Sequence, residues 1–298
     1  MEVRIWPVCL FGGRRCQKYH AGSHSGSRSG AAPKTPLLNI KLPPVRGSEW
    51  KPTQPEAIQE LISANENRKA LYGFLARTFA TEITVDYLRE LSEKKDLFLD
   101  SAKDPEVRGT ELADGFRQVA DYVSSLKGRD LESVRLELAV EYAGLFLGVW
   151  RVPSHPSESS YLTEGRLVMQ KPRDDVLKIY RSMGVDKAGE FAEPEDHIAL
   201  ELQFMTHLCD KTSAALKDGD LLEAKECLRV QRDFLSEHLD KWVPKLAADI
   251  LKSARGEFYK AVAKITEGYV AMDMQLVAEL IDNLPLPSGQ RASQTLDL

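Results

Sequence analysis

A short acidic stretch with a histidine holds the densest group of chemically active side chains in this 298-residue chain. It reads Glu193-Pro194-Glu195-Asp196-His197, and Glu201 follows one helical turn later. The i, i+4 spacing places His197 and Glu201 on the same side of a helix. Such a group can pair with cationic side chains, cap a helix or hold a metal ion.

Helix capping accounts for much of this stretch without any binding function. Proline is favoured at the first helical position, and acidic residues in the first turn complement the helix dipole. His197 does not fit that interpretation, because a cation at a helix N-terminus is unfavourable, so its ring should be neutral or paired with a carboxylate. A metal site is a poor interpretation as well, since no second histidine stands in a matching position.

A proline-rich stretch holds the second group of candidate residues. It reads His155-Pro156-Ser157-Glu158-Ser159-Ser160-Tyr161 and follows Trp150 and Pro153. Exposed tryptophan and tyrosine beside a carboxylate suit a peptide that has both apolar and basic parts. The alternative is an ordinary connection whose aromatic rings dock on the core. Tyr72 and Tyr142 are, by the same default, residues at the edge of the core.

Helical periodicity extends from Pro55 onward, and no sustained alternation typical of strands appears. Asp130 and Asp220 are placed to cap helices, and Gly128, Gly184 and Gly219 to end them. The expected helices cover about 58–80, 112–126, 131–145, 173–183, 198–218, 221–239 and 258–276. We therefore predict an all-α fold, an irregular bundle of two helical halves, 55–183 and 194–285, joined by a hinge at 184–193.

Charge divides the chain into two regions. Residues 1–50 carry eight Lys and Arg against two Asp and Glu, whereas residues 51–298 carry 32 against 43. Because Gly, Ser and Pro replace any apolar period, residues 1–54 are predicted to be a disordered basic extension, and 286–298 a disordered tail. Arg14 and Arg15 follow the apolar stretch instead of preceding it, so an export signal is not expected. A transit peptide or an upstream start codon are open alternatives.

The usual signatures of catalysis are missing from the sequence. It contains no phosphate-binding loop of the GxxxxGK[ST] or GxGxxG type, and neither HExxH nor GxSxG. The four cysteines form no CxxC pair, which favours a reducing compartment, and no apolar stretch is long enough to cross a membrane. The net negative charge of residues 51–298 disfavours binding of nucleic acid. We therefore expect no catalytic residues, no metal and no cofactor.

Three motifs, taken in order, resemble those of the TorD/DmsD family of redox-enzyme maturation chaperones. Tyr142-Ala143-Gly144-Leu145-Phe146 matches YxxLF, residues 156–161 are similar to PxESxY, and residues 193–197 match EPxDH. The resemblance covers roughly residues 65–284. It departs from the family at Ser157, where members often carry an aromatic residue, and in the basic extension.

This resemblance implies a cytoplasmic, non-enzymatic chaperone. It would bind the twin-arginine signal peptide of a molybdopterin-dependent oxidoreductase and assist cofactor insertion before export. An acidic body attracts a basic peptide, and an apolar groove takes the signal's hydrophobic segment as a helix. The implied client-binding residues are Asp196, His197, Glu193, Pro194, Glu158, Ser159, Tyr161, Tyr142, Trp150 and Tyr72.

Two other classes of function stay open at this point. A helical metal-dependent hydrolase would use Asp196, His197 and Glu201 as ligands. A nucleotide-regulated helical switch is the other, because the resemblance associates weak guanine-nucleotide binding with the family, although no phosphate loop is present. The chain is expected to be a monomer or a dimer that exchanges its helical halves through the hinge.

Overall fold

The computed structural model describes residues 54–148, 152–186 and 191–285. Within these ranges the chain forms helices joined by turns, and its one β-type pairing is an isolated bridge between single residues. The predicted all-α fold is therefore confirmed. The expected basic extension, apart from Gln54, and the expected tail lie outside the described residues, as do Trp150 and residues 187–190 of the expected hinge.

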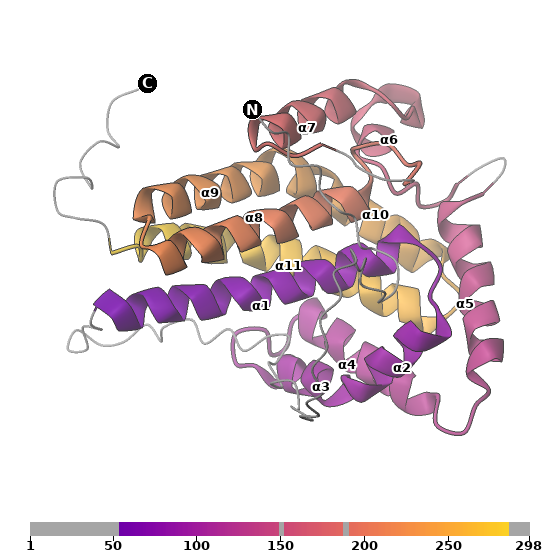
Figure 1. The fold of residues 1–298 in the computed structure, drawn as a ribbon. Helices are drawn as coiled ribbons and strands as arrows, with labels where there is room; N and C mark the ends of the chain where they lie inside the picture. The colour runs from indigo at the N-terminus through magenta and orange to yellow at the C-terminus, as the bar shows by residue number, and fades with distance from the viewer. Residues whose placement is uncertain (1–53, 149–151, 187–190, 286–298) are drawn as a thin grey trace, which may run out of the picture.

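Long helices form the body of the molecule (Figure 1). Helices α1 (Gln54–Ala80), α8 (Ile198–Asp218) and α9 (Leu221–Phe234) lie alongside one another, and α11 (Glu257–Asp282) runs behind them. Helix α10 (Asp240–Ser253) packs on α11. Their apolar faces meet in one continuous core that includes fully buried Leu71, Leu202, Trp242 and Phe258.

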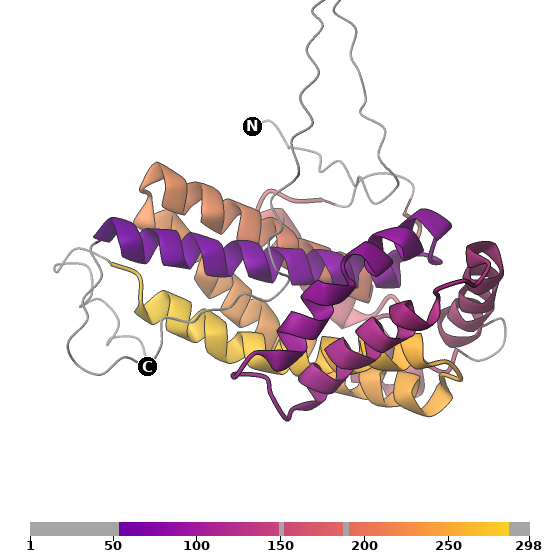
Figure 2. The same ribbon diagram turned by 90° about the horizontal axis from the view of Figure 1, so that it is seen from below.

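Shorter helices surround this body. Helices α2 (Val85–Glu93), α3 (Lys95–Lys103) and α4 (Glu111–Ser125) cover one side, where α4 packs along α11 (Figure 2). Helix α5 (Leu131–Phe146) stands at the edge of the molecule and contacts α2. Helices α6 (Ser159–Leu162), η1 (Glu164–Arg166) and α7 (Lys171–Ser182) lie at the opposite side from α2–α4.

Helices from the two halves of the sequence pack against each other. Helix α1 lies along α8, and α4 lies along α11. The approach of α4 to α11 is close, because a Cβ atom at Gly268 would come within 2.8 Å of Leu112, and one at Gly115 would come equally near Ile265. Exchange of the halves between two chains would reproduce these contacts, and the swapped dimer stays a prediction.

Local capping signals gave correct helix boundaries at several places. The carboxylates of Asp130 and Asp220 accept backbone N–H bonds at the starts of α5 and α9, and Gly219 ends α8 in the left-handed conformation.

The single helix expected over 221–239 is wrong at its end. Helix α9 stops at Phe234, one π-helical turn (η2, Leu235–Leu239) follows, and α10 then begins. Among the described helices, none is long and apolar enough to cross a membrane.

Candidate functional site

The two polar motifs of the sequence meet in space as a short antiparallel pairing. Ser157 and His197 form the isolated β-bridge. The Glu158 backbone N–H donates to the Asp196 carbonyl at 2.9 Å, and the Ile198 N–H donates to the Pro156 carbonyl at 2.8 Å. The loop before α6 and the turn before α8 therefore hold each other in register, although about forty residues separate them.

Asp196 anchors α6 from inside the protein. Its side chain is fully buried, and its Oδ2 atom accepts bonds from the Ser159 backbone N–H, at 2.8 Å, and from the Ser159 hydroxyl. The same hydroxyl oxygen accepts the Gln170 N–H at 3.2 Å. Asp196 thus fixes the start of α6 and, through Ser159, the entry to α7. The buried position of this carboxylate gives no support to the expected direct contact of Asp196 with a client.

His197 is the capping residue of α8, which corrects the interpretation drawn from the sequence. The helix begins at Ile198, and His197 Nδ1 accepts the Ala199 N–H at 3.1 Å. Pro194 is not at the first helical position but in the preceding turn, where its carbonyl accepts the His197 N–H. Burial, reinforced by nearby His155, lowers the pKa of His197 to about 3. The ring is therefore neutral, as a helix N-terminus requires.

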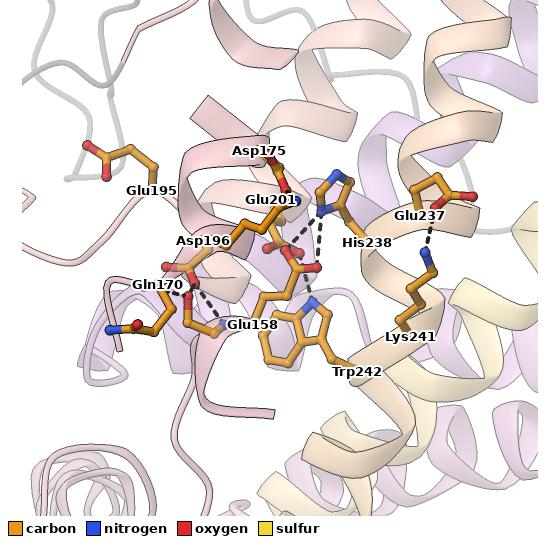
Figure 3. A network of polar contacts seen from close by, with 12 residues as sticks. Glu158, Gln170, Asp175, Glu195, Asp196, Glu201, Glu237, His238, Lys241 and Trp242 are labelled. Atoms are coloured by element: carbon orange, nitrogen blue, oxygen red, sulfur yellow. Dashed lines mark hydrogen bonds and ion pairs between the residues drawn. The ribbon is translucent and has the colours of Figure 1, made fainter. Parts of the chain in front are cut away.

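Two further buried carboxyl groups, those of Glu158 and Glu201, lie next to this antiparallel pairing (Figure 3). His238, in the π-helical turn, places Nδ1 2.9 and 3.1 Å from the two oxygens of Glu158. Glu201 Oε2 accepts the Trp242 indole N–H at 3.0 Å. Burial first, and then the charges of Glu158 and Asp196, raise the pKa of Glu201 well above its usual value. Burial therefore favours the protonated form of Glu201 over its carboxylate.

A cavity of about 350 Å³ lies in front of the pairing. Its walls bring together Tyr142 and Phe146 of α5, His155 and Pro156 of the first loop, and Glu193 and His197 of the second. Glu82, which follows α1, adds a carboxylate to the lining of the cavity, and Phe191 adds an aromatic ring. All three sequence motifs thus contribute to one cavity.

The cavity combines aromatic walls with carboxylates and neutral imidazoles. The rings of Phe191 and His197 meet edge to face with their centroids 5.4 Å apart. Burial, followed by the charges of Glu193 and Glu82, raises the pKa of Tyr142. Burial also lowers the pKa of His155. The acidic side chains that line the cavity suit a cationic side chain, while the aromatic rings suit its methylene stem.

The candidate residues divide into those at the cavity and those in the interior. Tyr142, Glu193 and His197 line the cavity, with Pro194 next to Glu193. Glu158 and Ser159 are buried, so of the two interpretations of this stretch the structure favours a connection that packs on the core. Tyr161 is half-buried, stacks on Trp242 and donates to Asp249 at 3.2 Å.

Tyr72 lies elsewhere in the structure. It is fully buried between α1 and α11, where its hydroxyl donates to Asp273 at 2.5 Å. Asp273 also forms a two-bond ion pair with buried Arg68. This network ties α1 to α11, so the expectation that Tyr72 contacts a client is not supported by its position.

Several residues of the site were missed by the sequence interpretation. Glu82 and Phe191 belong to no motif, and His238 stands some eighty residues from its partner Glu158. Single-sequence periodicity carries no signal for such contacts. The short helix α6 was also missed, because its four residues are fewer than a periodic pattern needs.

The side chains assigned to a metal-dependent hydrolase have other partners. Asp196 binds Ser159, His197 caps α8 and Glu201 binds Trp242. Across the described residues, no group of three or more His, Cys, Asp or Glu side chains is arranged to hold a metal ion. The geometry thus gives no support to the hydrolase alternative.

Comparison with known proteins gives one family model, several curated relatives and one solved structure. A family model described as nitrate reductase delta subunit matches residues 109–248. The chain is 30% identical to chaperone protein TorD of Photobacterium profundum, across 72% of this chain and 96% of that protein. It is 26% identical to chaperone protein TorD of Aliivibrio fischeri, across 74% and 99%. A putative redox enzyme maturation protein from Archaeoglobus fulgidus aligns with a TM-score of 0.38 and 20% identity, covering 68% of this chain and 93% of that structure.

Proposed function

The chain belongs to the TorD family of chaperones, and from this premise we propose that it binds the twin-arginine signal peptide of a molybdopterin-dependent oxidoreductase. In this proposal it acts in the cytoplasm, before the client is exported, and assists insertion of the client's cofactor. Its relatives are named chaperones, in agreement with the sequence-based expectation of a non-enzymatic protein.

The cavity between α5 and the start of α8 carries this proposal. It is lined by Tyr142, Pro156, Glu193 and His197, which come from the three motifs, and by His155 and Glu82. A guanidinium group has a flat apolar face and in-plane donors, so it matches aromatic walls that lie next to carboxylates. Buried Asp196 acts in this proposal by positioning the loops of the cavity, and not by touching the peptide.

The test is calorimetric titration of a synthetic twin-arginine peptide into the full chain and into single variants. Glu82→Gln and Glu193→Gln keep the shape of the cavity and remove one charge each. We expect each to weaken binding by about tenfold, which corresponds to about 1.4 kcal/mol. Glu226→Gln, at an exposed site on α9, is the matched control and should bind as the wild type does.

A second peptide distinguishes recognition of arginine from general attraction between charges. Replacing both arginines by lysine keeps the charge but removes the planar fork of donors. The lysine peptide should bind the wild type more weakly and should be less sensitive to Glu82→Gln. Equal affinity of all variants for the arginine peptide would exclude the cavity as the site.

A further inference from the structure

We propose that two adjacent arginines of this chain, Arg14 and Arg15, occupy the cavity between α5 and the start of α8 (the first cavity) while no client is bound, and so compete with the client's twin-arginine peptide. This inference rests on the proposed function and adds a regulation of the same site. The arginine pair lies outside the described residues, and the proposed function makes no use of it.

The lining of the first cavity differs in charge from that of two other cavities in the described part of the chain. Glu82 and Glu193 line the first cavity, and its described lining contains no lysine or arginine. A cavity between α1, α2 and α3 is lined by Arg77 and Lys94 with a single carboxylate. One between α5 and the α10–α11 turn is lined by Arg255 with two carboxylates. Of these three cavities, the first therefore repels an arginine pair least and attracts it most.

The arginine pair presents the same chemical groups as the peptide proposed for this cavity. Guanidinium groups stack on aromatic rings and donate in-plane bonds to carboxylates. The ring of Tyr142 is held in the cavity wall, because its hydroxyl donates to the Phe79 carbonyl at 3.0 Å. In this chain the apolar residues 5–11 precede the arginines, whereas in an export signal they follow them. The pair therefore imitates only the basic part of a signal peptide, and a client that brings both parts displaces it.

The length of chain between the arginine pair and α1 matches the distance to be spanned. Residues 16–53, 38 in number, separate Arg15 from the start of α1 and are rich in Gly, Ser and Pro. A linker of that length has an r.m.s. end-to-end distance of about 31–37 Å. Helix α1 runs from Gln54 to Ala80, which lines the first cavity, so its 27 residues cover about 40 Å (Figure 1). A tether whose r.m.s. length is close to its span gives an effective concentration of about 1 mM.

Opposite net charges add a long-range attraction to this contact. Residues 1–50 carry eight Lys and Arg against two Asp and Glu, and residues 51–298 carry 32 against 43. At an effective concentration of about 1 mM, a contact with a dissociation constant of about 0.5 mM is formed about two thirds of the time. The cavity is then open for about one third of the time, which weakens the apparent affinity for a client peptide about threefold.

Calorimetric titration of the synthetic twin-arginine peptide into the full chain tests this competition. Arg14→Gln/Arg15→Gln removes the internal ligand, so the peptide should bind this variant about threefold more tightly than the wild type. Arg28→Gln/Lys34→Gln is the matched control, because it removes two positive charges from the same extension and keeps the arginine pair. The control should bind the peptide as the wild type does.

A change within the first cavity links the gain in affinity to that cavity. Glu82→Gln weakens the internal contact as well as the peptide's own contact, so the internal competition masks part of its effect in the native chain. In the Arg14→Gln/Arg15→Gln background the loss of peptide affinity caused by Glu82→Gln should be up to about threefold larger. Glu226→Gln, at the exposed site on α9, should leave the affinity unchanged in both backgrounds.

The outcomes distinguish this inference from the proposed function. If the peptide binds Arg14→Gln/Arg15→Gln and wild type equally, the internal contact is overturned and the signal-peptide function stands. Equal gains from the two double variants also overturn it, because they indicate general attraction by a basic segment. A gain that disappears on dilution of the protein overturns the contact within one chain and assigns it to a second copy. A peptide that binds neither protein overturns the function, and the inference with it.

Discussion

His197 caps a helix and also lines the first cavity. One ring nitrogen caps α8, while the ring also lines the first cavity and packs against Phe191. Burial lowers its pKa to about 3, below the ordinary value of 6.5. A depressed pKa means that the neutral ring stabilises the fold above pH 6.5, and that this contribution is lost as the pH falls towards 3. Acidification would therefore disturb the cap and the cavity together.

Glu201 makes the opposite contribution to stability. Burial and the nearby charges of Glu158 and Asp196 raise its pKa, so its contribution is present at low pH and is lost as pH rises above the ordinary value of 4.5. Glu201→Gln keeps an acceptor for the Trp242 N–H and removes the titration. Relative to the wild type, the variant's unfolding free energy should increase with pH in this window, by at most about 1.4 kcal/mol per pH unit.

Urea unfolding of Glu201→Gln and wild type between pH 5 and 8 measures this difference. Glu267→Gln on α11 is a control, because Glu267 is a carboxylate of raised pKa that lies outside this buried network. A difference between Glu201→Gln and wild type that stays constant over the whole range would show that Glu201 titrates normally and that the buried pair holds no proton.

One serine hydroxyl contributes to the attachment of α6 to the turn before α8. Ser159 Oγ donates to Asp196 and accepts from Gln170, whereas the hydroxyl of Ser157, equally buried, has no hydrogen-bond partner among the described residues. Ser159→Ala leaves a buried carboxylate with one donor fewer and should lower the unfolding free energy by about 1–3 kcal/mol. Ser157→Ala should be close to neutral. Thermal and urea unfolding of both variants test this, and equal losses would contradict the anchoring role of Ser159.

Elements with strong local signals were predictable from the sequence, and the rest depended on contacts between distant segments. Caps at Asp130 and Asp220 fixed two helix starts, because the capping side chain lies beside the N–H groups it binds. His197 was misjudged because histidine is not among the preferred capping residues. The end of α9 was misplaced because the apolar period continues through the π-helical turn into α10, so periodicity shows no break.

The motifs of the candidate site could be identified from the sequence, but the burial of their side chains could not be predicted. Tyr142 comes from one motif and Glu193 and His197 from another, and all three line one cavity; their contact with a client stays a prediction. Nothing in one sequence separates a carboxylate that contacts a ligand from one that anchors a loop, so Glu158 and Asp196 were both expected to bind a client. Burial decides between these roles, and burial depends on helices such as α10 that come later in the chain.

At the scale of the molecule, net charge and cavity charge should act on different steps of binding. Residues 51–298 carry 32 Lys and Arg against 43 Asp and Glu, and this excess attracts a basic peptide at long range. Neutralising four exposed carboxylates away from the cavity, Asp96, Asp100, Glu226 and Asp233, should slow association at low salt and leave dissociation unchanged. Glu82→Gln should instead speed dissociation, because its carboxylate lies at the bound peptide. Stopped-flow binding with a fluorescent twin-arginine peptide separates the two rates.

Raising the ionic strength to about 0.5 M should remove most of the difference in association rate between the four-site variant and the wild type, since the screening length then falls to a few ångströms. Faster dissociation from the four-site variant would show that the peptide contacts the surface beyond the cavity, and would require a larger interface than the first cavity offers.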